Sequence, residues 1–138
     1  MKIESISISS DQINEMKKHV QNCLPEEGCG ILTGLNGDVK TVLPLTNRAH
    51  SAVRFFAEPV ELIQAFYWIE DQNLDIIGIF HSHPNGPETP SETDIREFNY
   101  PGAVSVILSN SQTNWQVRAF MIDNGGYREI RLIPDEKP

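Results

Sequence analysis

Apolar and polar positions alternate with two different periods along the chain, and the pattern predicts a mixed α/β fold. Residues 2–9 alternate at every second position, which is typical of a β-strand. The segment 9–25 begins with serine and aspartate, which favour helix caps, and then places apolar side chains at helical spacing up to a proline. The runs 27–35 and 39–47 flank an Asn-Gly dipeptide, so we expect two antiparallel strands joined by a tight hairpin turn.

The middle of the chain contains a loop and a second helix. Residues 47–59 show no regular period and are predicted to form a surface loop. The segment 58–73 places apolar side chains on one helical face. These positions are Val60, Ile63 and Tyr67 along one row and Leu62, Phe66 and Ile69 along another. We interpret this aromatic-rich stripe as core rather than as a cofactor site.

Five further elements complete the pattern. The segment 75–83 is apolar on both faces in its first half, as expected for a central strand covered on both sides. A short helix is predicted within 90–99, and three strands at 103–110, 115–123 and 127–134. The expected order is β-α-β-β-α-β-α-β-β-β, which indicates an α/β fold with a mixed, largely antiparallel sheet flanked by helices. Edge strands near the C-terminus could support a homodimer.

Composition fits one compact domain and excludes several function classes. The chain has 138 residues, 39% of them hydrophobic and 22% charged, and no apolar run approaches the length of a membrane span. The first residues lack a signal-peptide pattern, so we expect a cytoplasmic protein. A net charge of -8 argues against nucleic-acid binding. In that setting Cys23 and Cys29 are interpreted as structural thiols rather than a disulfide.

Two histidines stand two positions apart at the end of the predicted strand 75–83. Side chains two apart on a strand point to the same side, so His81 and His83 can aim both imidazoles at one point while Ser82 faces away. A catalytic zinc site needs such convergence, a third protein ligand and one open position. Asp94 can be the third ligand, because the intervening loop lets the chain reverse and start a helix near the end of the strand.

Two questions stay open from the residues alone. The spacing Ser91-x-x-Asp94 also fits a helix N-cap followed by an acidic residue, which needs no metal. A metal-activated water also needs a base, and Glu26 and Glu27 both precede an apolar strand, where a buried carboxylate is normally penalised. Spacing does not decide which glutamate matters, or whether both are exposed.

These residues carry a resemblance to a known family. The pattern His-x-His-x10-Asp that ends at Asp94, with a Glu-x-x-Gly upstream that starts at Glu27, resembles the JAMM (MPN+) zinc metalloproteases of the small prokaryotic type. The likeness spans about residues 3–122, because the strand, hairpin and long helix also come in the family's order. The resemblance implies a JAB1/MPN-type, cytidine-deaminase-like fold, with residues 1–138 as one domain.

The resemblance also implies an activity. His81, His83 and Asp94 would bind one zinc ion per chain, Glu27 would act as general acid and base, and Ser91 would hold the oxyanion. The implied reaction is hydrolysis of a peptide or isopeptide bond by metal-activated water. The implied substrate is the C-terminal tail of a ubiquitin-like or sulfur-carrier protein.

Three other functions are compatible with parts of the sequence. A cupin-type oxygenase would use Glu88 in a His-x-His-x4-Glu pattern, but no histidine follows His83. A zinc deaminase needs a Cys-x-x-Cys pair, which the chain lacks. The main alternative is a non-catalytic MPN-type scaffold or protein-binding module, although such proteins have lost residues that are all present here. His50 has no place in the motif and is expected at the surface.

Overall fold

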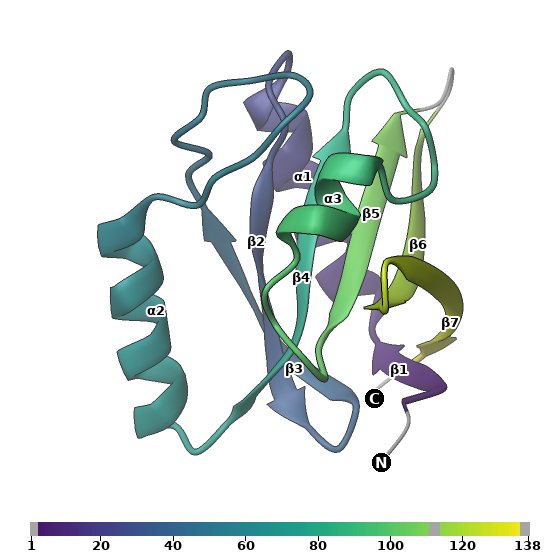
Figure 1. The fold of residues 1–138 in the computed structure, drawn as a ribbon. Helices are drawn as coiled ribbons and strands as arrows, with labels where there is room; N and C mark the ends of the chain where they lie inside the picture. Colours follow the sequence, from purple (N-terminus) through teal and green to yellow (C-terminus); the bar gives the residue numbers. More distant parts are fainter. Residues whose placement is uncertain (1–2, 111–113, 136–138) are drawn as a thin grey trace.

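The computed structural model describes residues 3–110 and 114–135, and its strands form a closed barrel (Figure 1). The elements are β1 (Ser5–Ile8), α1 (Ser10–Cys23), β2 (Cys29–Leu35), β3 (Asp38–Leu45), α2 (Pro59–Asp71), β4 (Asp75–His83), α3 (Glu92–Glu97), β5 (Val104–Asn110), β6 (Trp115–Asp123) and β7 (Gly126–Pro134). This is the predicted order, although residue 2 of the first predicted strand lies outside the described residues. None of the described helices has the length and apolar character needed to cross a membrane. The cytoplasmic location stays a prediction.

The sheet has the neighbour order β1-β3-β2-β4-β5-β6-β7 and closes because β1 pairs with both β3 and β7. Among the described strands four pairings are antiparallel and three are parallel, namely β1 with β3, β1 with β7 and β4 with β5. This confirms a mixed sheet in which antiparallel pairs are the majority. The sequence pattern does not predict the closure. Within the described residues β7 has a partner on each side, so the free C-terminal edge expected to support a homodimer is not present. The homodimer itself stays a prediction.

Local signals fixed the ends of several elements as expected. Ser9 is the N-cap of α1, and its hydroxyl and the side chain of Gln12 form a reciprocal capping box. The hairpin between β2 and β3 turns at Asn36 and Gly37, whose φ angles of 54° and 76° are the left-handed values that such a turn requires.

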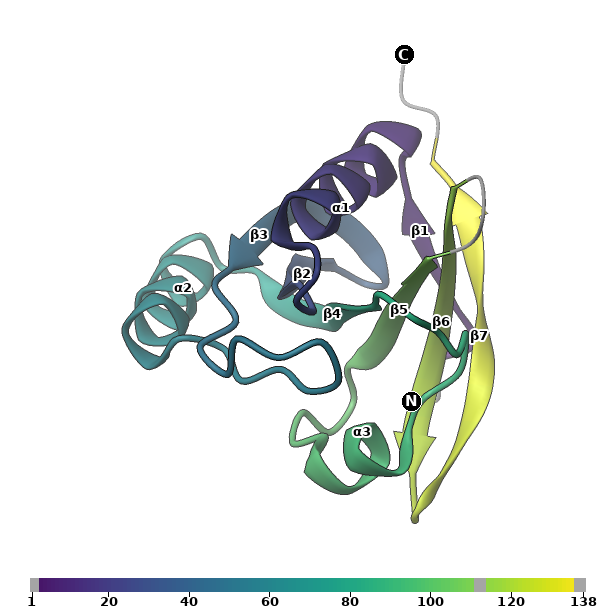
Figure 2. The same ribbon diagram turned by 90° about the horizontal axis from the view of Figure 1, so that it is seen from above.

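Two hydrophobic cores lie on opposite faces of the central strands. Met16 and Val20 of α1 pack with Leu32 and Phe80 on one face. Side chains from β2 and β4 pack with α2 on the other face, namely Cys29, Ile31 and Ile79 with Ala65 and Ile69. Figure 2 shows α1 and α3 on opposite sides of β4 and β5. Because side chains alternate along a strand, β2 and β4 serve both cores at once.

The interpretation of the α2 apolar stripe as core is wrong for most of its length. Ala65 and Ile69 are buried, but Val60 and Tyr67 are 59% and 71% exposed. The helix lies beside the barrel and contacts β3 and β4 along one side only (Figures 1 and 2). The row that contains Val60, Ile63 and Tyr67 therefore faces away from the sheet.

Candidate metal centre

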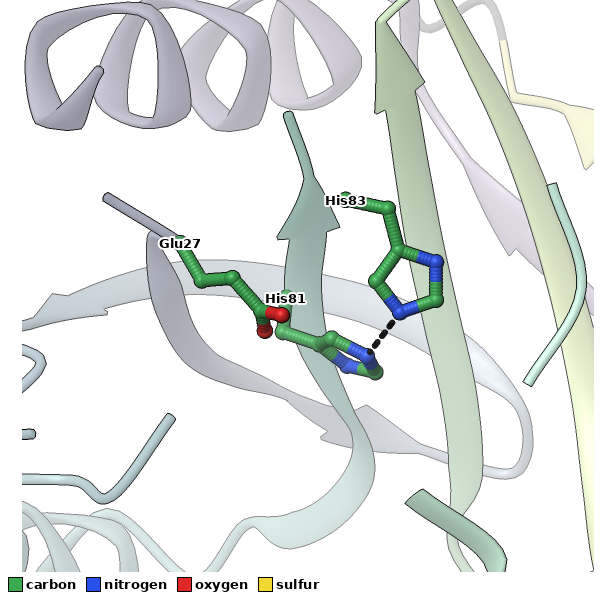
Figure 3. Close-up of side chains that lie close together, drawn as sticks. All are labelled: Glu27, His81 and His83. Atoms are coloured by element: carbon green, nitrogen blue, oxygen red, sulfur yellow. Dashed lines mark hydrogen bonds between the residues drawn. The ribbon is translucent and has the colours of Figure 1, made fainter. Parts of the chain in front are cut away.

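The end of β4 holds the two histidines as expected. His81 and His83 are both buried and point to the same face of the strand, with their Nε2 atoms 3.2 Å apart (Figure 3). Ser82 lies between them and faces the other way, where its Oγ accepts a hydrogen bond from the backbone N–H of Gly28 at 2.8 Å. The carbonyl of Gly28 in turn accepts from the N–H of Ser82. One strand therefore presents two imidazoles to the site and a structural hydroxyl to the neighbouring strand.

The first turn of α3 brings Asp94 to the histidines. Ser91 is the N-cap of this helix, with its Oγ accepting from the N–H of Asp94 and its own N–H donating to Asp94 Oδ2. The same Oδ2 lies 3.2 Å from His81 Nε2 and 3.0 Å from His83 Nε2. The helix-cap interpretation of the Ser-x-x-Asp spacing is thus confirmed, and the same carboxylate lies beside both histidines. The role of Asp94 as a metal ligand stays a prediction.

The three donor atoms fit a tetrahedral metal ion. They form a triangle with sides of 3.0, 3.2 and 3.2 Å. Tetrahedral zinc with bonds of about 2.0 to 2.1 Å holds its ligand atoms about 3.3 to 3.4 Å apart, so the triangle needs to open by only a few tenths of an ångström. The ring of His83 is already oriented, because its Nδ1–H donates to the carbonyl of Pro87 at 2.7 Å and this bond turns Nε2 toward the triangle.

Electrostatics prepare the carboxylate to act as an anion. Burial alone would raise the pKa of Asp94, but hydrogen bonds from His81 and His83 outweigh it and hold that pKa well below its usual range. Burial lowers the pKa of His81. It also opposes the charged form of His83, but hydrogen bonds to Asp94 and Pro87 leave the pKa of His83 raised.

Of the two glutamates that precede β2, Glu27 reaches the site. Cys29 pairs with His81 across the antiparallel ladder, and continuing that register places Glu27 opposite His83. Its side chain is buried, its Oε1 has no hydrogen-bond partner among the described residues, and its ligand atom lies within 4.8 Å of those of both histidines (Figure 3). Burial raises the pKa of Glu27 to about 8.

Two other residues considered for the site lie away from it. Glu26 pairs with His50 at 3.1 Å, and the side chain of His50 is 66% exposed, which confirms His50 as a surface residue. Glu88 is exposed and lies 3.8 Å from Arg118. The alternative in which Glu88 completes a cupin-type ligand set is therefore wrong.

Ser91 lies next to Asp94, and its role as an oxyanion donor stays a prediction. Its Oγ accepts from the backbone of Asp94 at 3.0 Å, which leaves the hydroxyl proton available for donation. Cys23 and Cys29 are both free thiols, as predicted. Burial raises the pKa of Cys29 to about 12, so this thiol stays protonated and is a poor nucleophile.

An apolar cavity of about 600 Å³ opens beside His81. Its walls come from β2, β4, the start of α2 and the segment after α3, and both His81 and Asp94 line it. Phe55 in this wall is not predicted by the sequence pattern, because the absence of a regular period in 47–59 indicates a surface loop. The ring of Phe55 stacks on His81 with ring centroids 4.6 Å apart and planes 22° from parallel. The signal in the sequence that could have indicated a buried side chain here is the pair of aromatic residues Phe55 and Phe56 in a loop without a regular period.

Comparisons with known proteins agree with this geometry. Residues 9–123 match the family model of the prokaryotic homologs of the JAB domain. The chain is 32% identical over 122 residues to a probable TtuB-protein conjugate cleaving protease of Thermus thermophilus, covering 88% of this chain and 77% of that protein. It is 28% identical over 125 residues to the CysO-cysteine peptidase of Mycobacterium tuberculosis, covering 88% and 86%.

Solved structures show a similar fold. A protein from Desulfitobacterium hafniense superposes with a TM-score of 0.86 at 31% identity, covering 96% of this chain and 94% of that one. A JAB1/MPN domain protein from Archaeoglobus fulgidus superposes with a TM-score of 0.59 at 18% identity, covering 94% and 98%, and confirms the fold class. With the family model spanning most of its length, this chain belongs to the prokaryotic homologs of the JAB domain.

Proposed function

We propose that this protein is a zinc-dependent peptidase that hydrolyses an amide or isopeptide bond at the C-terminal tail of a ubiquitin-like or sulfur-carrier protein. The observation that carries the proposal is the buried triangle of His81, His83 and Asp94 donor atoms with the protonatable carboxyl of Glu27 beside it. The donor set suits zinc, since imidazole nitrogen and carboxylate oxygen are both ligands of that ion.

The names of the relatives support the substrate class. One is named for cleaving conjugates of the protein TtuB, and another for releasing cysteine from CysO. Both names describe bond cleavage next to a small carrier protein. The apolar cavity beside His81 and Asp94 gives the tail of such a carrier a place to bind at the reacting bond.

In this proposal His81, His83 and Asp94 hold the zinc ion. When bound, zinc supplies Lewis acidity that polarises a carbonyl and makes water acidic near neutral pH. The hydrogen bond to Pro87 presets the orientation of the His83 ring, and the suppressed pKa of Asp94 keeps its carboxylate in the charged form that binds a cation. The helix cap at Ser91 keeps the carboxylate of Asp94 in place before a metal arrives.

Glu27 moves the proton. Its carboxylate accepts a proton from the attacking water and then returns it to the departing amine nitrogen. Burial raises the pKa of Glu27 to about 8 in the metal-free site, and a zinc ion bound beside it would lower this pKa toward neutral pH, where proton transfer in both directions is efficient. The hydroxyl of Ser91 donates to the oxygen that becomes negative when the water attacks the amide carbon.

Metal content and cleavage test the proposal together. We expect purified protein to carry about one zinc per chain by elemental mass spectrometry, His83→Ala to lose it, and His50→Ala, which removes an exposed histidine, to keep it. A carrier protein with a Gly-Gly tail joined to a lysine should be cleaved by the wild type and not by Glu27→Gln. Zinc binding without any cleavage would leave a metal-containing scaffold, and no zinc uptake would refute the hydrolase.

A further inference from the structure

The two histidines of the site are held in place by different means. His83 is fixed by the hydrogen bond from its Nδ1 to the carbonyl of Pro87. The corresponding Nδ1 of His81 is buried and has no hydrogen-bond partner among the residues that the structure describes. A metal-binding histidine is ordinarily oriented by a hydrogen bond at its second nitrogen. For His81 something else has to set the plane of the ring.

The ring of Phe55 is in the position to do so. It lies nearly parallel to the imidazole of His81, with centroids 4.6 Å apart, while His83 meets the same imidazole edge-on at 4.9 Å. Rotation of the His81 ring out of its present plane would drive it into Phe55. The stack also removes water from one face of a ring that is almost fully buried.

Phe55 is itself held from both sides by one buried side chain. Asn47 donates through Nδ2 to the carbonyl of Arg54, and its Oδ1 accepts from the N–H of Phe56, so the residues before and after Phe55 are both bonded to it. The Nδ2 of Asn47 also donates to the carbonyl of Glu27 at 3.0 Å. Asn47 therefore holds the backbone on both sides of Phe55 and also the backbone of Glu27.

The loop is tied to α3 as well. The guanidinium of Arg54 meets the carboxylate of Glu97 at 2.7 and 3.3 Å, which joins the residue next to Phe55 to the helix that carries Asp94. This pair is half-exposed and contributes little stability on its own. It nevertheless adds a second restraint on where the ring of Phe55 lies.

We propose that Phe55 is a positioning residue that fixes the imidazole of His81 for metal binding by stacking, in place of the missing hydrogen bond at Nδ1. The inference rests on the proposed zinc site and concerns how that site is preorganised. A ring held in one orientation loses no rotational freedom when the ion binds, so the stack raises metal affinity. Removing it is expected to weaken zinc binding about 10- to 100-fold, as loss of an orienting partner does elsewhere.

The test measures zinc affinity rather than turnover. Metal-free wild type, Phe55→Ala, Phe55→Leu and Phe55→Tyr are titrated with zinc in competition with a chromogenic chelator, and circular dichroism checks that each is folded. Phe55→Leu keeps apolar bulk over His81 without a flat ring, and Phe55→Tyr restores the ring. Phe56→Ala is the matched control, because this neighbouring phenylalanine is 54% exposed.

We expect Phe55→Ala and Phe55→Leu to bind zinc more weakly by about 10- to 100-fold, with Phe55→Tyr and Phe56→Ala within about threefold of the wild type. Wild-type affinity in the folded leucine variant would overturn the positioning role while leaving the zinc site intact. Equal losses in Phe55→Leu and Phe56→Ala would overturn it too, since the effect would then be general to the loop. A wild type that binds no zinc overturns the proposed function and this inference together.

Discussion

Replacing Glu27 by glutamine removes a titratable carboxyl from the site and keeps its shape, so the effect on stability can be worked out from its pKa. The pKa of this carboxyl rises from 4.5 to about 8 on folding because of burial. Below pH 4.5 the carboxyl is protonated in both the folded and the unfolded state, so its ionisation does not change the free energy of unfolding. Between pH 4.5 and 8 the unfolded chain releases the proton while the fold retains it, so the fold loses stability as pH rises.

The magnitude follows from the two pKa values. Each pH step between them costs about 1.4 kcal/mol, which amounts to about 3 kcal/mol at pH 7 as an upper bound for a rigid, dry site. Glutamine removes this pH-dependent cost. Its amide can leave a buried donor unpaired, which costs about 1 to 3 kcal/mol, but that cost is the same at every pH. The quantity to measure is therefore how the free energy of unfolding of Glu27→Gln, minus that of the wild type, changes with pH.

The assay is urea unfolding of chelator-treated wild type and Glu27→Gln at several values between pH 4.5 and 8. The free energy of unfolding of the variant minus that of the wild type should increase by about 2 to 3 kcal/mol from pH 4.5 to pH 7. Added zinc should shrink the increase, because a nearby cation favours the ionised glutamate. A difference that stays constant with pH would refute the view that this carboxyl is buried in its protonated form.

Three further results are expected. Ser82→Ala should lower the free energy of unfolding by about 1 to 3 kcal/mol at every pH in urea titrations, because the buried N–H of Gly28 loses its acceptor; an unchanged midpoint would mean that another acceptor takes its place. Ser91→Ala should keep zinc and lower the cleavage rate about 100- to 1000-fold. It should also lower the free energy of unfolding by about 1 kcal/mol, because the helix that carries Asp94 loses its cap. A cleavage rate near that of the wild type would exclude Ser91 as an oxyanion donor. Zinc at 100 times its Kd should raise the free energy of unfolding of the wild type by about 2.7 kcal/mol and leave His83→Ala unchanged, as followed by thermal melts; equal shifts in both would place the metal elsewhere.

The parts of the site that the sequence predicted are those set by local rules. His81 and His83 share a face because side chains alternate along a strand, and Asp94 enters the site because Ser91 starts a helix three residues earlier. The choice between Glu26 and Glu27 could not be made this way. It depends on the pairing of β2 with β4, which joins residues about fifty positions apart and is not written in either segment alone.

The parts that were missed depend on contacts between distant segments. The loop 47–59 has no period because its residues serve different neighbours: Asn47 is buried among backbone groups, Phe55 stacks on His81, and Arg54 reaches α3. The α2 stripe was wrongly predicted to be core for the opposite reason. Its apolar period is clear, but period alone does not say that the helix contacts the sheet along one side only.

Closure of the barrel has a consequence for how the protein is made. β1 is translated before the other strands of the barrel, and its longest pairing is with β7, which is translated last among them. Until β7 is available, β1 and β6 each expose an unpaired edge that other chains can join. A chain that stops before β7 can contain every residue of the metal site and still be prone to aggregate, so intact product depends on translation reaching the last strand.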